Sequence, residues 1–279
     1  MRSFLKVWFG ISFMAVGLGI AIVIIAFATS GFHKAEATTS LHKNYEGVKS
    51  IEMDINYREV NVVEGEQFSI SAEDIVENEI DSYVKDGTWY IKENSKDNVN
   101  FFGFHVSIDE IFNWGNSHQI TITIPKDFIA KNITAYINAG SLEIDELTAD
   151  NCDLKVQSGQ LSVNKLEISN QSKYHVGTGE ITINHIIAKD IDLSCDVGKI
   201  NVSGTITGDN SIQNNVGEVK LTLDGKESDY SYQVSCNVGN VTIGDLRYHK
   251  INNQIINDNN AKNNIKLDCS VGNIKVKFN

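Results

Sequence analysis

From about residue 49 onward, apolar and polar residues alternate with a period of two over much of the chain. The alternation is clear in residues 51–55, 60–62, 89–91 and 120–124. Such a pattern predicts β-strands that bury one face. The first thirty residues differ, because they contain a continuous apolar stretch from Val7 to Ala28. We therefore expect an all-β body that follows an N-terminal hydrophobic segment.

A glycine-centred repeat runs through the second half of the chain. Seven glycines recur at intervals of 19 to 22 residues, except for a last interval of 33, and apolar residues stand two and four positions after each. The repeat glycines are Gly140, Gly159, Gly179, Gly198, Gly217, Gly239 and Gly272. Equivalent apolar side chains of successive repeats can stack, which predicts a parallel β-solenoid, similar to a β-helix, with coils of about 19 residues and three short strands each. Each glycine is expected at a corner with positive φ. An antiparallel sandwich is the alternative, but it does not require seven glycines in one register.

These patterns divide the chain into five parts. Residues 49–130 hold strands outside the repeat, which we interpret as a cap over the open edge of the solenoid. Residues 247–264 contain seven asparagines and are interpreted as a solvated loop inserted into the last coil. The expected parts are a cytoplasmic tail (1–6), a transmembrane helix (7–28), a linker (29–48), an N-terminal β region or cap (49–130) and the solenoid (131–279).

The stretch from Val7 to Ala28 is long enough for a membrane anchor. As a helix it would span roughly 33 Å, about the thickness of the hydrocarbon core of a bilayer. Arg2 and Lys6 precede it, which predicts a cytoplasmic N-terminus and an extracytoplasmic body in a single-pass membrane protein. The alternative is a signal peptide cleaved near Thr29 or Thr38, which would release a secreted body.

The charge of the chain excludes one class of partner. Its formal net charge is −12, and both basic residues of the first thirty precede the apolar stretch. The remaining body is therefore still more acidic and would repel phosphate backbones, so we expect no nucleic-acid binding. No cofactor motif is present, and no Gly-Gly-x-Gly-x-Asp repeat that would bind calcium occurs. We therefore predict neither a cofactor nor a metal site.

Three of the four cysteines share one position in the repeat. Cys195, Cys236 and Cys269 each stand three residues before a repeat glycine, in a column that is otherwise apolar except for Asn214. We interpret them, together with Cys152, as core residues. Cys236 and Cys269 are expected on adjacent coils, so a disulfide between them is the alternative.

Some polar residues on the outer face have the types of catalytic groups. His175 and Ser194 are expected to stack on neighbouring coils, with Asp192 or Asp196 diagonal to them. A flat sheet surface offers no oxyanion hole, so we predict no catalytic residue here. Polysaccharide lyases and hydrolases with a β-helix are the enzyme alternative, but the three arginines of this chain do not stack with acidic clusters in the repeat. A row of alternating charge follows the glycines, formed by Glu180, Lys199 and Glu218.

An aromatic segment between two strands is the candidate interaction patch. It includes Phe101, Phe102, Phe104, Phe112 and Trp114. A capping-box spacing within it predicts a short helix over 108–113. One interpretation is that this helix folds over the open end of the solenoid. The other is that the aromatic side chains are exposed and contact the membrane surface or a partner protein.

Several stretches of the chain resemble a known bacterial family. They are "SIEMDINYREVNV", "DGTWYIKE", "ITITIPKDF", "ITAYINAGSLEIDEL", "SDYSYQVSCNVGNVTIGD" and "IKLDCSVGNIKVKF". They are similar to a family of domains of unknown function that carries the label "putative adhesin", and the similarity covers about residues 49–279. The resemblance implies a β-helix-like surface protein, often behind one membrane anchor in Gram-positive bacteria. It implies no catalytic residue.

Together these features predict a binding or sensing protein of the cell envelope. The expected partner is an envelope polymer or a membrane protein that the sequence does not identify. A component of an envelope-stress signalling system is the alternative function, and a carbohydrate-active enzyme with a β-helix is a further one.

Overall fold

The computed structural model describes residues 38–94, 99–101, 104–106, 119–249, 254–258 and 260–279. All the elements below belong to the compact unit Thr38–Asn279. The predicted transmembrane helix, Val7 to Ala28, lies outside the described residues. Within the described part of the chain, no helix has the length and apolar content needed to cross a membrane.

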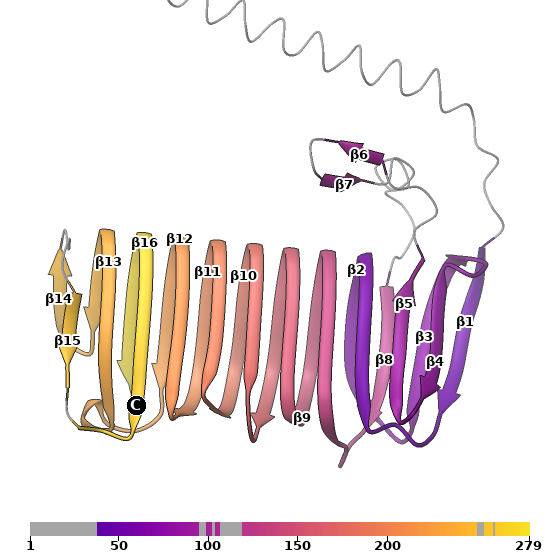
Figure 1. Ribbon diagram of the computed structural model, residues 1–279, viewed down its shortest axis with the longest axis horizontal. Coiled ribbons are helices and arrows are strands. Elements are labelled where there is room, and N and C mark those ends of the chain that lie inside the picture. Colours follow the sequence, from indigo (N-terminus) through magenta and orange to yellow (C-terminus); the bar gives the residue numbers. More distant parts are fainter. Residues whose placement is uncertain (1–37, 95–98, 102–103, 107–118, 250–253, 259) are drawn as a thin grey trace, which may run out of the picture. The chain divides into compact units, whose positions relative to one another are not determined.

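The second half of the chain forms the predicted solenoid. Its strands are β9 (Ile129–Ile168), β10 (Ser172–Lys189), β11 (Ile191–Thr207), β12 (Asp209–Leu223), β13 (Tyr230–Ile243) and β16 (Asn263–Phe278). Neighbouring coils are parallel and in register, so that from Gly159 onward each repeat glycine pairs with a repeat glycine of an adjacent coil. Figure 1 shows these coils side by side in one row. The prediction of an all-β solenoid is therefore confirmed.

Burial follows the alternation of the sequence. The apolar side chains two and four positions after each repeat glycine, and five positions before it, are all buried in one continuous core. The strands differ from the prediction in one respect, because β10 and β11 continue through the glycine corner instead of breaking into three short strands. The repeat glycines have positive φ, between 136° and 154°, as predicted, and the pairing with the neighbouring coil continues through them, so the ladder bends at the corner without ending.

The order of the coils departs from the order of the chain at the C-terminal end. β16 lies between β12 and β13, so Gly272 pairs with both Gly217 and Gly239. The segment interpreted as a solvated loop, 247–264, contributes to β14 (Leu246–His249) and β15 (Gln254–Asn257), which both pair antiparallel with β13. These short strands occupy the edge that β13 would otherwise expose, and an open edge would invite pairing with other chains.

The N-terminal region contributes a coil of its own. It contains β1 (Thr38–Tyr45), β2 (Ser50–Gly65), β3 (Phe68–Val76), β4 (Ile80–Lys85), β5 (Thr88–Glu93) and β8 (Gln119–Pro125). β2 pairs parallel with β9, with Arg58 at the position of a repeat glycine. The solenoid therefore begins at β2, upstream of the boundary expected at residue 131. β1 begins inside the stretch expected as a linker, because it pairs with β3 and its Tyr45 packs on Trp89.

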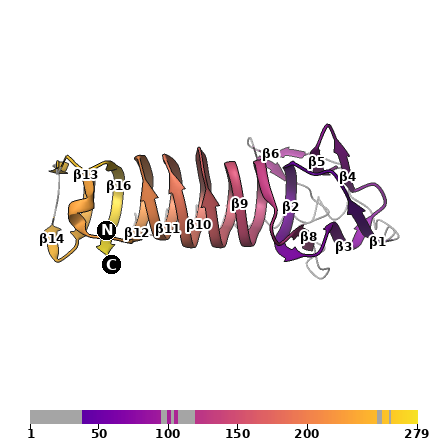
Figure 2. The ribbon, with the colours of Figure 1, turned by 90° about the horizontal axis from the view of Figure 1, so that it is seen from below.

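The remaining N-terminal strands end the row of coils, as Figure 2 shows from below. One half of β2 pairs with β5 and the other with β8, so two ladders diverge from this strand. Aromatic side chains fill the space between them. Trp89 is fully buried, its ring lies 4.9 Å from that of Tyr45 and 6.2 Å from that of Phe68, and its Nε1 donates to Ser82 Oγ at 2.9 Å.

The aromatic segment is described only in part. β6 (Val99–Phe101) and β7 (Phe104–Val106) form a separate antiparallel pair in which Phe101 is opposite Phe104. Phe102, Phe112, Trp114 and the predicted helix over 108–113 lie outside the described residues. The hypothesis of an interaction patch therefore stays a prediction.

Candidate functional site

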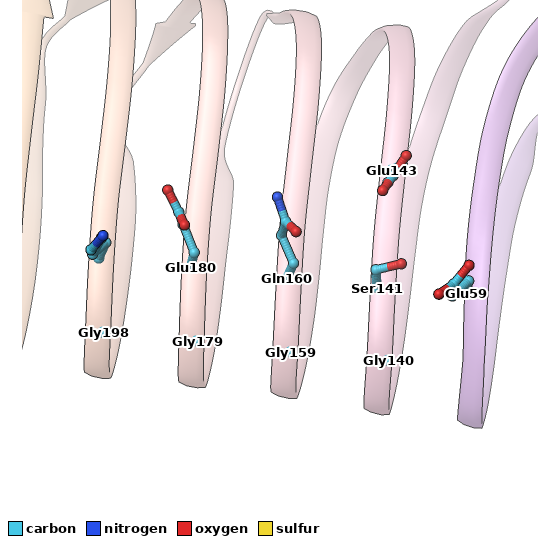
Figure 3. Close-up of a pocket in the computed structure, with 10 residues that line it drawn as sticks. Glu59, Gly140, Ser141, Glu143, Gly159, Gln160, Gly179, Glu180 and Gly198 are labelled. Carbon is cyan, nitrogen blue, oxygen red and sulfur yellow. The ribbon is translucent and has the colours of Figure 1, made fainter. Parts of the chain in front are cut away.

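An open, shallow groove of about 590 Å³ follows the glycine corner of the solenoid. It crosses β2, β9, β10 and β11, and Figure 3 shows its residues on neighbouring coils. The lining residues are Glu59, Gly140, Ser141, Glu143, Gly159, Gln160, Gly179, Glu180, Gly198 and Lys199. It is elongated across the coils, so it suits an extended ligand better than a compact one.

The floor of the groove is bare backbone. A Cβ atom placed on Gly159 would lie 1.8 Å from the carbonyl oxygen of Gly140, and one on Gly198 would lie 1.7 Å from that of Gly179. No side chain can therefore occupy these positions. The coils stack too closely at the corner for side chains, and this is why a depression lies between the flanking rows of side chains.

One wall carries polar side chains at the spacing of the coils. Glu59, Ser141, Gln160, Glu180 and Lys199 each follow the corner residue of their coil, and their strands pair in register. Figure 3 shows the first four in a row beside the glycines. Adjacent strands in a sheet lie about 4.8 Å apart, so the wall repeats hydrogen-bonding groups at about that interval.

The groove carries an excess of negative charge. Three carboxylates, those of Glu59, Glu143 and Glu180, face a single cation, Lys199. Glu180 Oε1 accepts hydrogen bonds from Asn201 Nδ2 at 2.8 Å and from Thr182 Oγ1 at 3.3 Å, which hold this carboxylate in place. A ligand with cationic groups or hydrogen-bond donors fits this wall, and an anionic polymer would be repelled.

Sequence reasoning predicted no groove but identified several of the residues that line it. Four of the repeat glycines form its floor, and the other three continue the same corner through the later coils. The alternation of Glu180 and Lys199 was visible along the sequence. Glu59 was missed because its coil has Arg58 in place of the glycine. The signal was present, since Val60 and Val62 stand two and four positions after Arg58, as apolar residues do in every repeat.

The predicted stacking of His175 and Ser194 is present on the outer face. His175 Nδ1 lies 2.9 Å from Ser194 Oγ, and His175 Nε2 lies 3.9 Å from Asp196 Oδ2. The second distance is too long for a hydrogen bond, so the carboxylate does not orient the imidazole as an activated serine requires. None of the three residues lines the groove. The contact is therefore a hydrogen bond on an open surface.

All four cysteines are buried and free. Burial raises the pKa of Cys195 to about 11 and that of Cys269 to about 12, so both thiols stay protonated and unreactive at neutral pH. Cys195 Sγ donates to the carbonyl oxygen of Gly179 at 3.9 Å, and Asn214 Nδ2 donates to that of Gly198 at 3.2 Å. Asn214 therefore fits its otherwise apolar column because its amide points at the glycine corner of the neighbouring coil.

The described residues contain no group of three or more His, Cys, Asp or Glu side chains that could hold a metal ion.

None of the curated proteins matches the sequence. Several solved structures are similar, including two crystal structures. The first is a "putative cell adhesion protein" from Clostridium sporogenes, with 16% identity, a TM-score of 0.35, and coverage of 87% of this chain and 100% of that one. The second is a "putative adhesin" from Bacteroides fragilis, with 14% identity, a TM-score of 0.42, and coverage of 86% and 98%.

A family comparison covers the larger part of the chain. The family described as "Toastrack DUF4097" matches residues 128–277, more than half of the sequence. The matched residues contain all seven repeat glycines and most of the solenoid strands. The resemblance that the repeats suggested is confirmed, and the chain belongs to the Toastrack DUF4097 family.

Proposed function

We propose that the chain is a binding protein of the cell envelope, anchored by Val7 to Ala28, whose groove holds an extended polymer. The observation that carries this proposal is the groove itself, which presents a polar group at each of five successive coils. A polymer that lies along the row of coils meets an equivalent group at each step. Weak contacts then add up along its length.

The charges in the groove limit the classes of polymer that can bind there. Its carboxylates outnumber its one cation, and the body as a whole is acidic. A neutral or cationic polymer therefore fits, such as a glycan backbone with hydroxyl and amide groups or free amines. Retention of a polymer, and not its cleavage, is the role we assign, because the groove is open to water along its length.

The first test removes charge from the groove. Replacing Glu143 and Glu180 together by glutamine is expected to weaken binding to insoluble chitosan fragments, a glycan with free amines, about tenfold, which corresponds to about 1.4 kcal/mol. Cosedimentation of the purified protein with the fragments measures it. The matched control replaces Asp153 and Asp192 by asparagine, two exposed acids of the flat face, and should bind as the unchanged protein does. Equal losses in both variants would show that only the overall charge matters.

The second test concerns the anchor. A reporter enzyme that works only outside the cytoplasm, fused after Asn279, is expected to be active, because Arg2 and Lys6 favour a cytoplasmic N-terminus. The fusion should also stay with the membrane fraction after alkaline washing. Recovery of the body in the medium with a new N-terminus near Thr29 or Thr38 would instead establish cleavage and secretion. If the protein bound the polymer with its anchor but not without it, the signalling alternative would be favoured, because that function requires a membrane partner.

A further inference from the structure

Four valines form an exposed apolar row on the last coils of the solenoid. Each precedes a repeat glycine, and each is about half exposed: Val197 (48%), Val216 (45%), Val271 (46%) and Val238 (62%). Their strands, β11, β12, β16 and β13, are neighbours in that order, and the valines pair in register. We call this row the valine stripe.

The stripe is confined to one half of the corner. On β9 and β10, the same position is held by Ala139, Ser158 and Thr178, which are small or polar. Outward positions of a solvated sheet are normally polar, and contiguous apolar side chains on a monomer usually mark a contact with another molecule. The corner thus changes from a polar groove to an apolar stripe along the row of coils.

Charge is distributed unevenly beside the stripe. At its β11–β12 end stand Asp196, Lys199 and Glu218, while the flanking residues at its β16–β13 end are uncharged. The uncharged residues are Ser270, Asn273, Asn237 and Asn240. A surface that places a neutral polar flank opposite the charged end, and its own charges opposite the neutral end, packs on this stripe without contacts between like charges.

We propose that the stripe binds a second copy of this chain, with the two rows of coils antiparallel about a two-fold axis. Val197 then faces the partner's Val238, and Val216 faces the partner's Val271. The charged end of each copy meets the uncharged end of the other, so asparagine amides and not like charges lie opposite Lys199 and Glu218. The stripe is thus complementary to itself in the way that a two-fold interface requires.

A parallel arrangement of two copies is disfavoured by the groove. It would place the two grooves face to face in one interface, where the carboxylates of Glu59, Glu143 and Glu180 would approach those of the partner. The antiparallel arrangement overlaps only β11, β12, β16 and β13, so β2, β9 and β10 keep their part of the groove uncovered. If the grooves bind a polymer as proposed above, the pair would bind it with two sites, but the pairing itself does not depend on that function.

The area sets the strength of the association. A stable interface buries about 800 Å² per partner, and four half-exposed valines with their flanks supply only part of that. The pair is therefore weak and reversible, and two-dimensional confinement would favour it. Both copies are acidic, so salt should strengthen the association by screening their mutual repulsion.

Cross-linking distinguishes the two arrangements. Full-length chains with Val197→Cys and with Val238→Cys, carrying different tags, are co-expressed and treated with a bis-maleimide too short to span three strand spacings, about 14 Å. The antiparallel pair predicts a mixed product several-fold more abundant than the Val197→Cys homodimer. The unchanged chain is the control, because its own cysteines are buried. A dominant Val197→Cys homodimer would overturn the antiparallel arrangement, and no dimeric product would overturn the proposal.

A second experiment tests whether the valine stripe causes the self-association. Replacing Val216 and Val271 together by lysine should weaken self-association of the full-length chain at least tenfold in sedimentation equilibrium. Ile187→Lys is the matched control, since Ile187 is 57% exposed and lies outside the stripe. Unchanged melting temperatures in both variants would show that folding is intact. Equal association of the double variant and the control would exclude the stripe as the interface, and binding of the unchanged chain to vesicles instead of to itself would identify a lipid surface as the occupant.

Discussion

Replacing Gly198 by alanine is expected to destabilise the solenoid by at least about 3 kcal/mol. Gly198 has φ of 144°, a conformation that L-residues rarely adopt. Its new Cβ atom would also lie 1.7 Å from the carbonyl oxygen of Gly179, which is backbone and cannot move aside. The coils on both sides would have to separate, and their ladder hydrogen bonds would weaken. Urea unfolding of the unit Thr38–Asn279, followed by far-UV circular dichroism, measures the loss.

Two controls separate the causes of that loss. Gly47 also has positive φ, 72°, but a Cβ atom there would meet nothing within 4 Å. Gly47→Ala should therefore cost only the conformational part, about 1 kcal/mol. Ser211→Val changes an exposed outward position and should alter the stability by no more than about 0.5 kcal/mol. If Gly198→Ala cost no more than Gly47→Ala, the close stacking at the corner would be wrong.

Replacing Arg58 by methionine is expected to destabilise the protein by about 3–5 kcal/mol. Arg58 is 2% exposed, its Nη2 lies 2.5 Å from Glu79 Oε1, and its Nε lies 2.7 Å from Glu93 Oε1. Glu93 Oε2 also accepts the backbone N–H groups of Asn56, at 2.7 Å, and Tyr57, at 3.1 Å. This cluster joins the first coil to the strands beyond it. Without the guanidinium, a buried carboxylate would remain without its cation.

Restoring the charge balance should recover much of that loss. The triple variant Arg58→Met, Glu79→Gln and Glu93→Gln keeps an oxygen that can accept both backbone N–H groups but carries no net charge. We expect it to be clearly more stable than Arg58→Met alone in the same unfolding measurement. A triple variant as unstable as the single one would mean that the aliphatic part of Arg58 stabilises by packing and that the ion pairs contribute little.

The coil that contains Arg58 could have been recognised from the sequence as a further repeat. Its coil lacks the glycine but keeps Val60 and Val62 in the buried positions. The stacking partner on one side is Gly140, whose missing Cβ leaves room for the Arg58 carbonyl oxygen. An arginine is tolerated because no further repeat glycine stacks beyond it. The end of a repeat therefore departs from the consensus where its neighbours change.

What the sequence determined by itself is the cross-section of each coil. The period of two assigns most side chains in the repeats to the core or to solvent, and the glycines mark the corner, because both are local properties of consecutive residues. The four valines of the stripe are exceptions, since they are in phase with buried positions but are exposed at the corner. Only the tertiary structure decided the order of the last coils and the pairing of β2. The apolar side chains that follow Gly217, Gly239 and Gly272 are similar in size and shape. Their stacking alone therefore does not determine which of these three coils lie next to one another. The choice depends on how β14 and β15 cover the edge of β13 and on how Arg58 pairs with Glu79 and Glu93, contacts between residues far apart in the chain. The groove and the valine stripe follow from that order, because each is a row of side chains taken one from each coil.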